Sequence, residues 1–216
     1  QQPLLSDLYY LDRALSPFSE VRQGNIADLL KRELAVLVLS DIGQLGDAEK
    51  RLLEPWLERG GVLIRFAGPR LTENTDTLTP VTVRTGGGRQ LGGAMSWSQP
   101  ATLAPFPENS PYFGLAIPND VTIKQQVLAE PDVNLSAKTW ARLNDGTPLV
   151  TAEKRGQGWL VLYHTTANTS WANLAISGLF VDLLRRTVDL AQGIAGAEGS
   201  EALRPIATLD GFSRLG

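Results

Sequence analysis

Short apolar runs alternate with amphipathic segments in the first third of the chain. The runs Leu34–Leu39 and Val62–Phe66 are bounded by polar residues or glycines. A run that is apolar on both faces is typical of a strand covered by helices on either side. Residues 47–59, between the runs, carry one apolar helical stripe, and Pro55 within it predicts a kink or a break. The order predicts two central, parallel strands joined by a right-handed crossover.

Helical spacing and capping residues predict further elements around this centre. Ser6 and Asn25 are typical N-caps, and a long apolar stripe that includes Phe180 and Leu184 precedes Gly193. We expect the last of these helices to flank the sheet together with the helix at 47–59. The predicted elements are helices over 5–15, 25–31 and 175–192 and a strand over 18–22.

The middle of the chain has a different character. Residues 70–137 are rich in Thr, Gly, Pro and Asn and lack helical periodicity, which indicates an irregular, β-rich insertion. Alternation predicts strands at 81–84 and 121–128, with Gly86–Gly88 as a hairpin tip. The triple glycine lacks the lysine and hydroxyl residue of a phosphate loop, which favours a turn over a nucleotide site.

Regular alternation returns after the insertion. Residues 138–143, 147–153 and 159–164 predict a meander of three antiparallel strands, with Asp145-Gly146 as one tight turn. Residues 1–193 are therefore expected to form one α/β domain. The Gly- and Ala-containing stretch at 194–216 is expected to be a loosely ordered tail.

Composition narrows the classes of function. Hydrophobic residues make up 43% and charged residues 20% of the 216 residues, which suffices for a packed core. The net charge of -3, with no basic stripe, argues against a nucleic-acid partner. No run of about 18 apolar residues is present, so no direct membrane insertion by this segment is expected. The start at Gln1 favours a domain cut from a longer polypeptide.

The residue types also limit the chemistry. The chain has no cysteine and one histidine, His164. Disulfides, thiolate metal sites and cysteine nucleophiles are therefore excluded, and neither a metal nor a cofactor is predicted.

Three segments resemble a known superfamily. They are GGVLIRFAGPRL (60–71), DGTPLVTAEKRGQGWLVLYHTT (145–166) and SWANL (170–174). They are similar to the class I glutamine amidotransferase-like superfamily, especially its trehalose-utilisation-type members. More narrowly, they resemble the soluble region of large bacterial membrane proteins that have an N-terminal double-transmembrane, aerotolerance-type segment and a C-terminal domain of unknown function. The resemblance covers roughly residues 8–192.

The resemblance implies a fold and a cellular setting. The fold is a three-layer, flavodoxin-like sandwich with a mixed, mostly parallel sheet, and its functional groups gather at the carboxyl ends of the strands. The setting is the periplasmic side of the bacterial inner membrane, as part of a membrane-anchored protein. The implied partners are other domains of that protein or a membrane-associated assembly.

The candidate site residues follow the strands. His164, at a strand end, could be a general base near Ser40 or Asp41, or a polar residue that closes the strand, and the second interpretation is favoured. Thr165 and Trp171 are candidate ligand-binding residues in the same region. We therefore expect a non-catalytic domain that binds a ligand or partner, and the alternative is a hydrolase that uses His164 with a Ser or Asp partner.

Arg65 is the one charge in an otherwise apolar strand. A buried charge needs a partner, and the predicted partner is Asp41 or Glu153 on a neighbouring strand. A structural ion pair is favoured over an anion-binding role, although Arg65 stays among the ligand-binding candidates.

Overall fold

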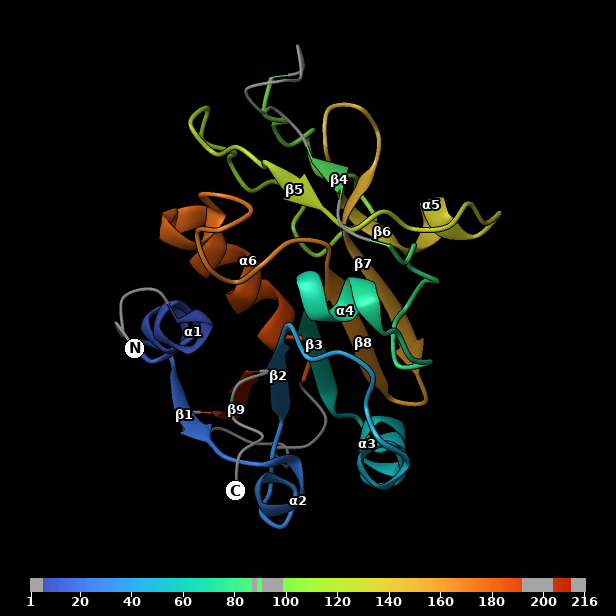
Figure 1. Ribbon diagram of the computed structural model, residues 1–216. Helices are drawn as coiled ribbons and strands as arrows, with labels where there is room; N and C mark the ends of the chain where they lie inside the picture. Colours follow the sequence, from blue (N-terminus) through green and yellow to red (C-terminus); the bar gives the residue numbers. More distant parts are fainter. Residues whose placement is uncertain (1–5, 87–88, 91–98, 192–203, 211–216) are drawn as a thin grey trace.

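The chain forms a three-layer α/β sandwich around one mixed sheet (Figure 1). The computed structural model describes residues 6–86, 89–90, 99–191 and 204–210. Five neighbouring strands are parallel, and the meander adds two antiparallel strands at one edge. In sheet order, the strands are β1 (Ser19–Gln23), β9 (Arg204–Asp210), β2 (Val36–Ser40), β3 (Val62–Phe66), β8 (Gly158–Tyr163), β7 (Pro148–Arg155) and β6 (Thr139–Arg142).

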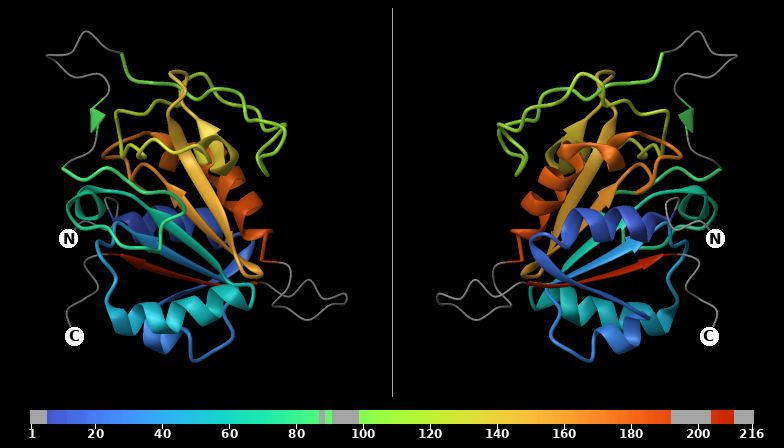
Figure 2. Two further views of the ribbon diagram at one scale, coloured as in Figure 1. Left: turned by 90° about the vertical axis from the view of Figure 1, so that its right-hand side faces the viewer. Right: turned by 90° about the vertical axis from the view of Figure 1, so that its left-hand side faces the viewer.

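Helices cover both faces of the sheet. Figure 2 shows α2 and α3 on one face and α1 and α6 on the other. Ser6 and Asn25 cap α1 and α2 through their side chains, as predicted. The helices are α1 (Asp7–Leu15), α2 (Ile26–Leu29), α3 (Asp47–Glu58), α4 (Pro69–Glu73), α5 (Leu135–Lys138) and α6 (Gly178–Val188), and Leu174–Ile176 form a 3-10 turn, η2.

The two central apolar runs contribute side chains to two separate hydrophobic cores. In β2, Val36 and Val38 pack with α1 and α6, whereas Leu37 and Leu39 pack with α2 and α3. Successive side chains of a strand point to opposite faces, so a strand that is covered twice must be apolar throughout. The prediction that β2 and β3 are central and parallel, between the layers of α3 and α6, is confirmed.

A kink or a break was predicted at Pro55, and helix α3 continues through this residue without a break. Pro55 lacks the N–H that would bond to the Arg51 carbonyl. Both residues are exposed, and water can therefore solvate the carbonyl that proline leaves without a partner.

The expectation of a loose tail is wrong for residues 204–210, because they form β9 inside the sheet. Ile206 is completely buried and pairs with Val21 on one side and Val36 on the other. Pro205 obscured this strand in the sequence, since proline disfavours a central strand. It lies at the second position of β9, where its carbonyl still accepts a hydrogen bond from the Ala35 N–H at 3.1 Å.

The described part of the insertion holds less regular structure than predicted. The expected strands at 81–84 and 121–128 reduce to isolated bridges and to β5 (Gln125–Gln126), which pairs antiparallel with β4 (Arg89–Gln90). Helix α4 begins at Pro69, because proline is favoured at the first helical position, and its other residues lie within the segment predicted as irregular. Of the predicted glycine hairpin tip, Gly87 and Gly88 lie outside the described residues.

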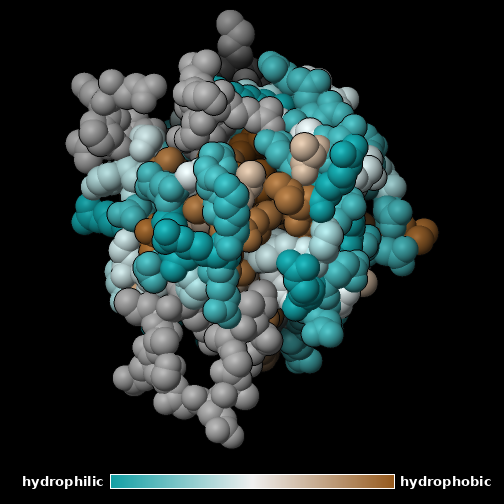
Figure 3. All heavy atoms as spheres, turned by 90° about the horizontal axis from the view of Figure 1, so that it is seen from below, coloured by the Kyte–Doolittle hydropathy of each residue, from teal (hydrophilic) through white to brown (hydrophobic). Residues whose placement is uncertain are grey.

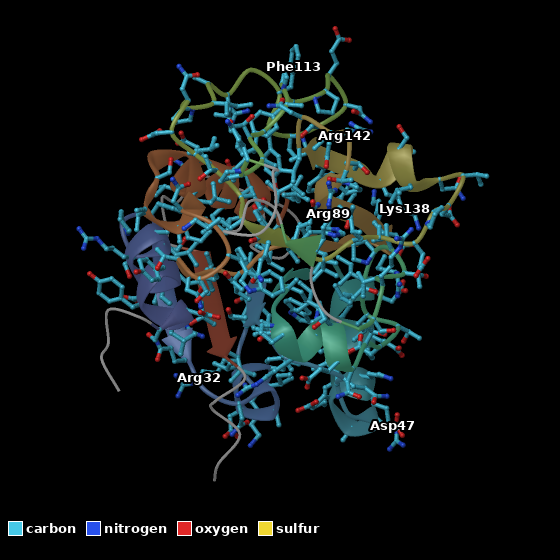
Figure 4. All side chains as sticks on the ribbon, turned by 45° about the horizontal axis from the view of Figure 1, so that its top comes forward. Arg32, Asp47, Arg89, Phe113, Lys138 and Arg142 are labelled. Atoms are coloured by element: carbon cyan, nitrogen blue, oxygen red, sulfur yellow. The ribbon has the colours of Figure 1, made fainter. Side chains whose placement is uncertain are left out.

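Basic side chains near the insertion are held by local partners. Figure 4 labels Arg89, Lys138 and Arg142 in this region. Arg89 pairs with Asp145 at 2.7 Å, and Lys138 donates to the Pro80 carbonyl at 3.1 Å. Each of these two contacts therefore joins a residue of the insertion to a residue of the meander.

The surface is mostly hydrophilic on the face shown in Figure 3, with apolar atoms near its centre. No helix in the described part of the chain is long and apolar enough to cross a membrane. Among the described residues, the large hydrophobic side chains with substantial exposure come from separate segments and are Leu52, Phe113, Val133 and Ile176.

The buried stripe of α6 gives a test of the packing. Phe180 and Leu184 are almost completely buried, so Phe180→Ala or Leu184→Ala should each lower the free energy of unfolding by about 2–5 kcal/mol. Asp182, exposed on the same helix, is the control, and Asp182→Ala should change the value by less than about 0.5 kcal/mol. Urea denaturation measures all three, and no loss in either core variant would contradict the packing.

Candidate functional site

A cavity of about 200 Å³ lies beyond the carboxyl ends of β2 and β8 and beside the start of α4. Open α/β sheets bind their ligands at this edge, where strands end and loops begin. The cavity is lined by Asp7, Ser40, Asp41, Pro69, Arg70, Thr166, Asn168, Ser170 and Trp171.

Asp41 is held at the end of β2 in a backbone conformation that is unusual for a residue other than glycine. Its φ is 46°, in the left-handed region. Its carboxylate accepts hydrogen bonds from the backbone N–H groups of Arg70 and Leu71, both at 3.1 Å, in the first turn of α4. A Cβ atom on Gly68 would lie 2.3 Å from this carboxyl group, so the close approach requires glycine.

The environment of Asp41 raises the pKa of its carboxyl group above the ordinary value. Burial is the main cause, because it disfavours the charged form. The hydrogen bonds from Leu71 and Arg70 oppose this rise, and the nearby charge of Asp7 adds to it. The ionised form of Asp41 is therefore less favourable in the folded protein than in water.

Asp7 brings a second carboxylate to the cavity from the first turn of α1. It accepts hydrogen bonds from the Ser40 hydroxyl and from the Asn168 side-chain amide. These contacts join α1 to the end of β2 and to the loop after β8. A carboxylate in the first turn also suits the helix dipole, and for that reason the sequence pattern alone marks Asp7 only as part of a helix start.

Thr166 supplies a buried hydroxyl without a partner. The residue is 4% exposed, and no described residue forms a hydrogen bond with its Oγ1. A buried hydroxyl left unpaired costs about 1–3 kcal/mol. Thr166 lines the cavity, but its Oγ1 has almost no accessible surface, so a group bound there reaches this oxygen only if the wall moves.

Two larger cavities lie elsewhere. One, of about 630 Å³, is bounded by the insertion and α5, and the other, of about 490 Å³, lies between α1 and the start of α6. Neither is lined by any of the buried side chains that lack a hydrogen-bond partner in the described part of the chain. The smaller cavity is therefore the stronger candidate.

His164 follows β8, as predicted, but it does not line the cavity. It is completely buried, and its Nδ1 lies 2.8 Å from the Val127 carbonyl oxygen. A carbonyl can only accept, so Nδ1 carries the proton and Nε2 accepts from the Thr151 hydroxyl at 2.9 Å. Burial lowers the pKa of His164 to about 4. Both ring nitrogens are thus engaged, and neither bonds to Ser40 or Asp41.

Arg65 is completely enclosed and forms an ion pair with Asp76 at 2.7 Å. The expectation of a structural ion pair is correct in kind, but the expected partners, Asp41 and Glu153, are wrong. Asp76 follows α4 in the insertion, a segment whose course the sequence pattern did not reveal.

The structure separates the predicted site residues into two groups. Ser40, Asp41 and Trp171 line the cavity, together with Asp7 and Thr166. The other three candidates, His164, Arg65 and Thr165, are each held by internal hydrogen bonds. No group of three or more His, Cys, Asp or Glu able to hold a metal ion occurs among the described residues.

The buried imidazole predicts a specific pH dependence. Because the pKa of His164 in the folded state lies below the ordinary 6.5, the unfolded chain takes up the proton first as the pH falls. His164 is the only histidine, so the free energy of unfolding should drop by about 1–2 kcal/mol between pH 6.5 and 5. Urea titrations measure this drop, and it should be absent in His164→Asn. A flat wild-type profile would contradict a buried, neutral imidazole.

The raised pKa of Asp41 predicts that ionisation of this side chain lowers the stability as the pH rises. This direction is opposite to that of His164, which lowers the stability as the pH falls. Its ionised form opposes folding near neutral pH, so Asp41→Asn should unfold at the same or a higher temperature at pH 7. The difference should vanish in acid, where both side chains are neutral. Asp28 is the control: its pKa is lowered by Lys31, and Asp28→Asn should not raise the unfolding temperature. A clear loss in Asp41→Asn would assign Asp41 a purely stabilising role.

Comparisons with known proteins identify the fold alone. No family model and no curated protein matches the chain. The solved structure of cytoplasmic protein STM3548 from Salmonella typhimurium matches with a TM-score of 0.58 and 15% identity, over 76% of this chain and 74% of that one. Cytoplasmic protein STM1381 from Salmonella typhimurium LT2 matches with a TM-score of 0.54 and 16% identity, over 86% of each chain. At these identities the likeness extends to architecture and not to activity.

Proposed function

We propose that this domain binds a small polar ligand in the cavity beside Asp41 and does not catalyse amide transfer or hydrolysis. The observation that carries the proposal is Asp41 in the wall of that cavity, a residue at positive φ whose partly buried carboxylate accepts from two backbone N–H groups. A residue with a strained backbone and a raised pKa, beside the second carboxylate of Asp7, is typical of a functional site.

The absence of cysteine and the internal contacts of His164 support the non-catalytic part of the proposal. The chain has no cysteine, so the usual glutaminase thiolate cannot form. A base must also reach the proton that it removes. The Nε2 atom of His164 accepts from Thr151 inside the fold and has no free lone pair to offer a substrate.

The alternative, a hydrolase that uses His164 with a Ser or Asp partner, has weaker support. The Ser40 hydroxyl donates to Asp7, whereas His164 contacts Thr151 and Val127. A hydrolase of this kind would require both residues to exchange these partners.

The family resemblance supplies the setting of the proposal. If the domain is amidotransferase-like and belongs to a membrane-anchored bacterial protein, its partners are other domains of that protein or of a membrane-associated assembly. Placement on the periplasmic side stays a prediction from the resemblance, and the topology of the full-length protein tests it.

The test pairs a turnover assay with a binding screen. The purified chain should release no product from a panel of ester and amide substrates. In a nitrogen-15 NMR screen of small polar fragments, some should shift the Thr166 amide and the Trp171 indole N–H signals. Hydrolysis that disappears in a folded His164→Asn or Ser40→Ala variant would overturn the non-catalytic assignment. A screen in which no fragment moves the cavity signals would overturn the binding site.

A further inference from the structure

We infer that the outer edge of β1 is an interaction surface for a second copy of this chain, which pairs with it strand to strand in antiparallel orientation. Strand β1 lies at one end of the sheet, beside β9 (Figure 1). A strand in that position presents backbone groups to which a strand of another chain can bond. No residue of β1 lines the candidate cavity, so this inference is independent of the proposed binding function.

The course of β9 shows which backbone groups of β1 point outward. Pro205 has no N–H, and its carbonyl accepts from the Ala35 N–H, on the β2 side of β9. Successive residues of a strand direct their backbone groups to opposite neighbours, so Ile206 bonds to β1. In a parallel pair, Ile206 bonds to the residues before and after its register partner, Val21. The N–H and C=O of Val21 therefore point away from the sheet.

The accessible part of this edge runs from Glu20 to Gln23. Among the described residues, none outside β9 forms a backbone hydrogen bond with Val21 or Gln23. Val21 is half-buried and Gln23 is exposed. Ser19, at the start of the strand, is only 3% exposed. A partner strand is therefore centred on Val21.

The charges of β1 are complementary to those of a second, antiparallel β1. A twofold axis at Val21 places this residue opposite Val21 of the second copy. The same axis places Glu20 opposite Arg22 of the second copy, and Arg22 opposite Glu20. Both side chains reach solvent, with 56% of Glu20 and 28% of Arg22 exposed. Opposite charges directly across a strand pair are favourable.

The charge pattern also selects one register. Outward backbone groups must meet outward groups, so the two strands can slip only by two residues at a time. A slip in one direction sets Glu20 against Glu20 of the second copy, and a slip in the other sets Arg22 against Arg22. Like charges in these positions are unfavourable. In the central register, the two Val21 residues exchange both backbone hydrogen bonds, and the charged pairs take the positions where side chains approach most closely.

The opposite end of the sheet has the protection that β1 lacks. Strand β6 pairs with β7 through two register irregularities. The Ala104 N–H donates to the Arg142 carbonyl at the end of β6, at 2.9 Å, and Leu103 forms a bridge with Leu143. Irregular pairing and a covering segment both hinder association at a sheet edge. Strand β1 pairs with β9 without a register shift and contains neither lysine nor proline.

The small size of this contact predicts a weak dimer. A few residues of one strand from each chain bury far less than the roughly 1,200 Å² of stable interfaces, so the dissociation constant should be on the order of 100 µM. Sedimentation of the 216-residue chain in low salt should show monomer at about 10 µM and a substantial fraction of dimer at about 500 µM. A monomer at both concentrations would refute the inference.

Charge exchange in β1 tests the register. Glu20→Arg or Arg22→Glu alone sets like charges opposite each other and should weaken dimerisation about 10-fold. The double variant with both substitutions restores opposite charges, so its dissociation constant should return to within about threefold of the wild-type value. Thermal unfolding of each variant checks that it is folded. A double variant that dimerises as weakly as the single ones would rule out this register.

Glu54→Arg is the matched control, because Glu54 is exposed on α3 and the change in net charge is the same as in Glu20→Arg. It should leave the dissociation constant unchanged. Equal weakening by the two variants would mean that net charge, and not β1, governs association. A dimer that no β1 variant weakens uses another surface, and this result would also overturn the inference.

Discussion

The buried ion pair between Arg65 and Asp76 is the contact on which the candidate site depends. Both side chains are essentially inaccessible to solvent, and the two charged groups lie 2.7 Å apart. The guanidinium also donates to the carbonyls of Leu78, Ile42 and Gly43, so its hydrogen bonds extend well beyond its partner. Loss of either partner would leave a buried charge uncompensated, an arrangement that costs several kcal/mol in proteins (about 3–5).

The pair fixes the course of the backbone around the cavity. Ile42 and Gly43, whose carbonyls bond to Arg65, directly follow Asp41. Asp41 in turn holds the first turn of α4 through the N–H of Arg70. One guanidinium in β3 thereby anchors the segment that keeps Asp41 at a positive φ. The position of the carboxylate is thus a consequence of packing in the layer of α3.

Local patterns allowed much of the fold to be predicted, and long-range pairing accounts for most of the errors. The runs that became β2 and β3 were apolar on both faces, which is a local property of the sequence. Strand β9 lies between two strands from the other end of the chain, and the pairing of its Ile206 with Val21 and Val36 has no local signal. Asp41 could be predicted because it directly follows an evident strand. Asp7 and Asp76 could not, because their partners depend on how distant segments pack.

Three departures from local rules meet at the cavity, and their coincidence supports a binding role. Asp41 has a positive φ and a raised pKa, and Thr166 has an unpaired hydroxyl. An unpaired hydroxyl alone decides nothing, since Ser19 and Thr208 also lack partners. Proteins otherwise favour choices that are consistent at every level, and their exceptions concentrate at functional sites. In the described part of this chain, only the cavity at the carboxyl edge of the sheet is lined both by a partly buried carboxylate at positive φ and by a residue with an unpaired hydroxyl.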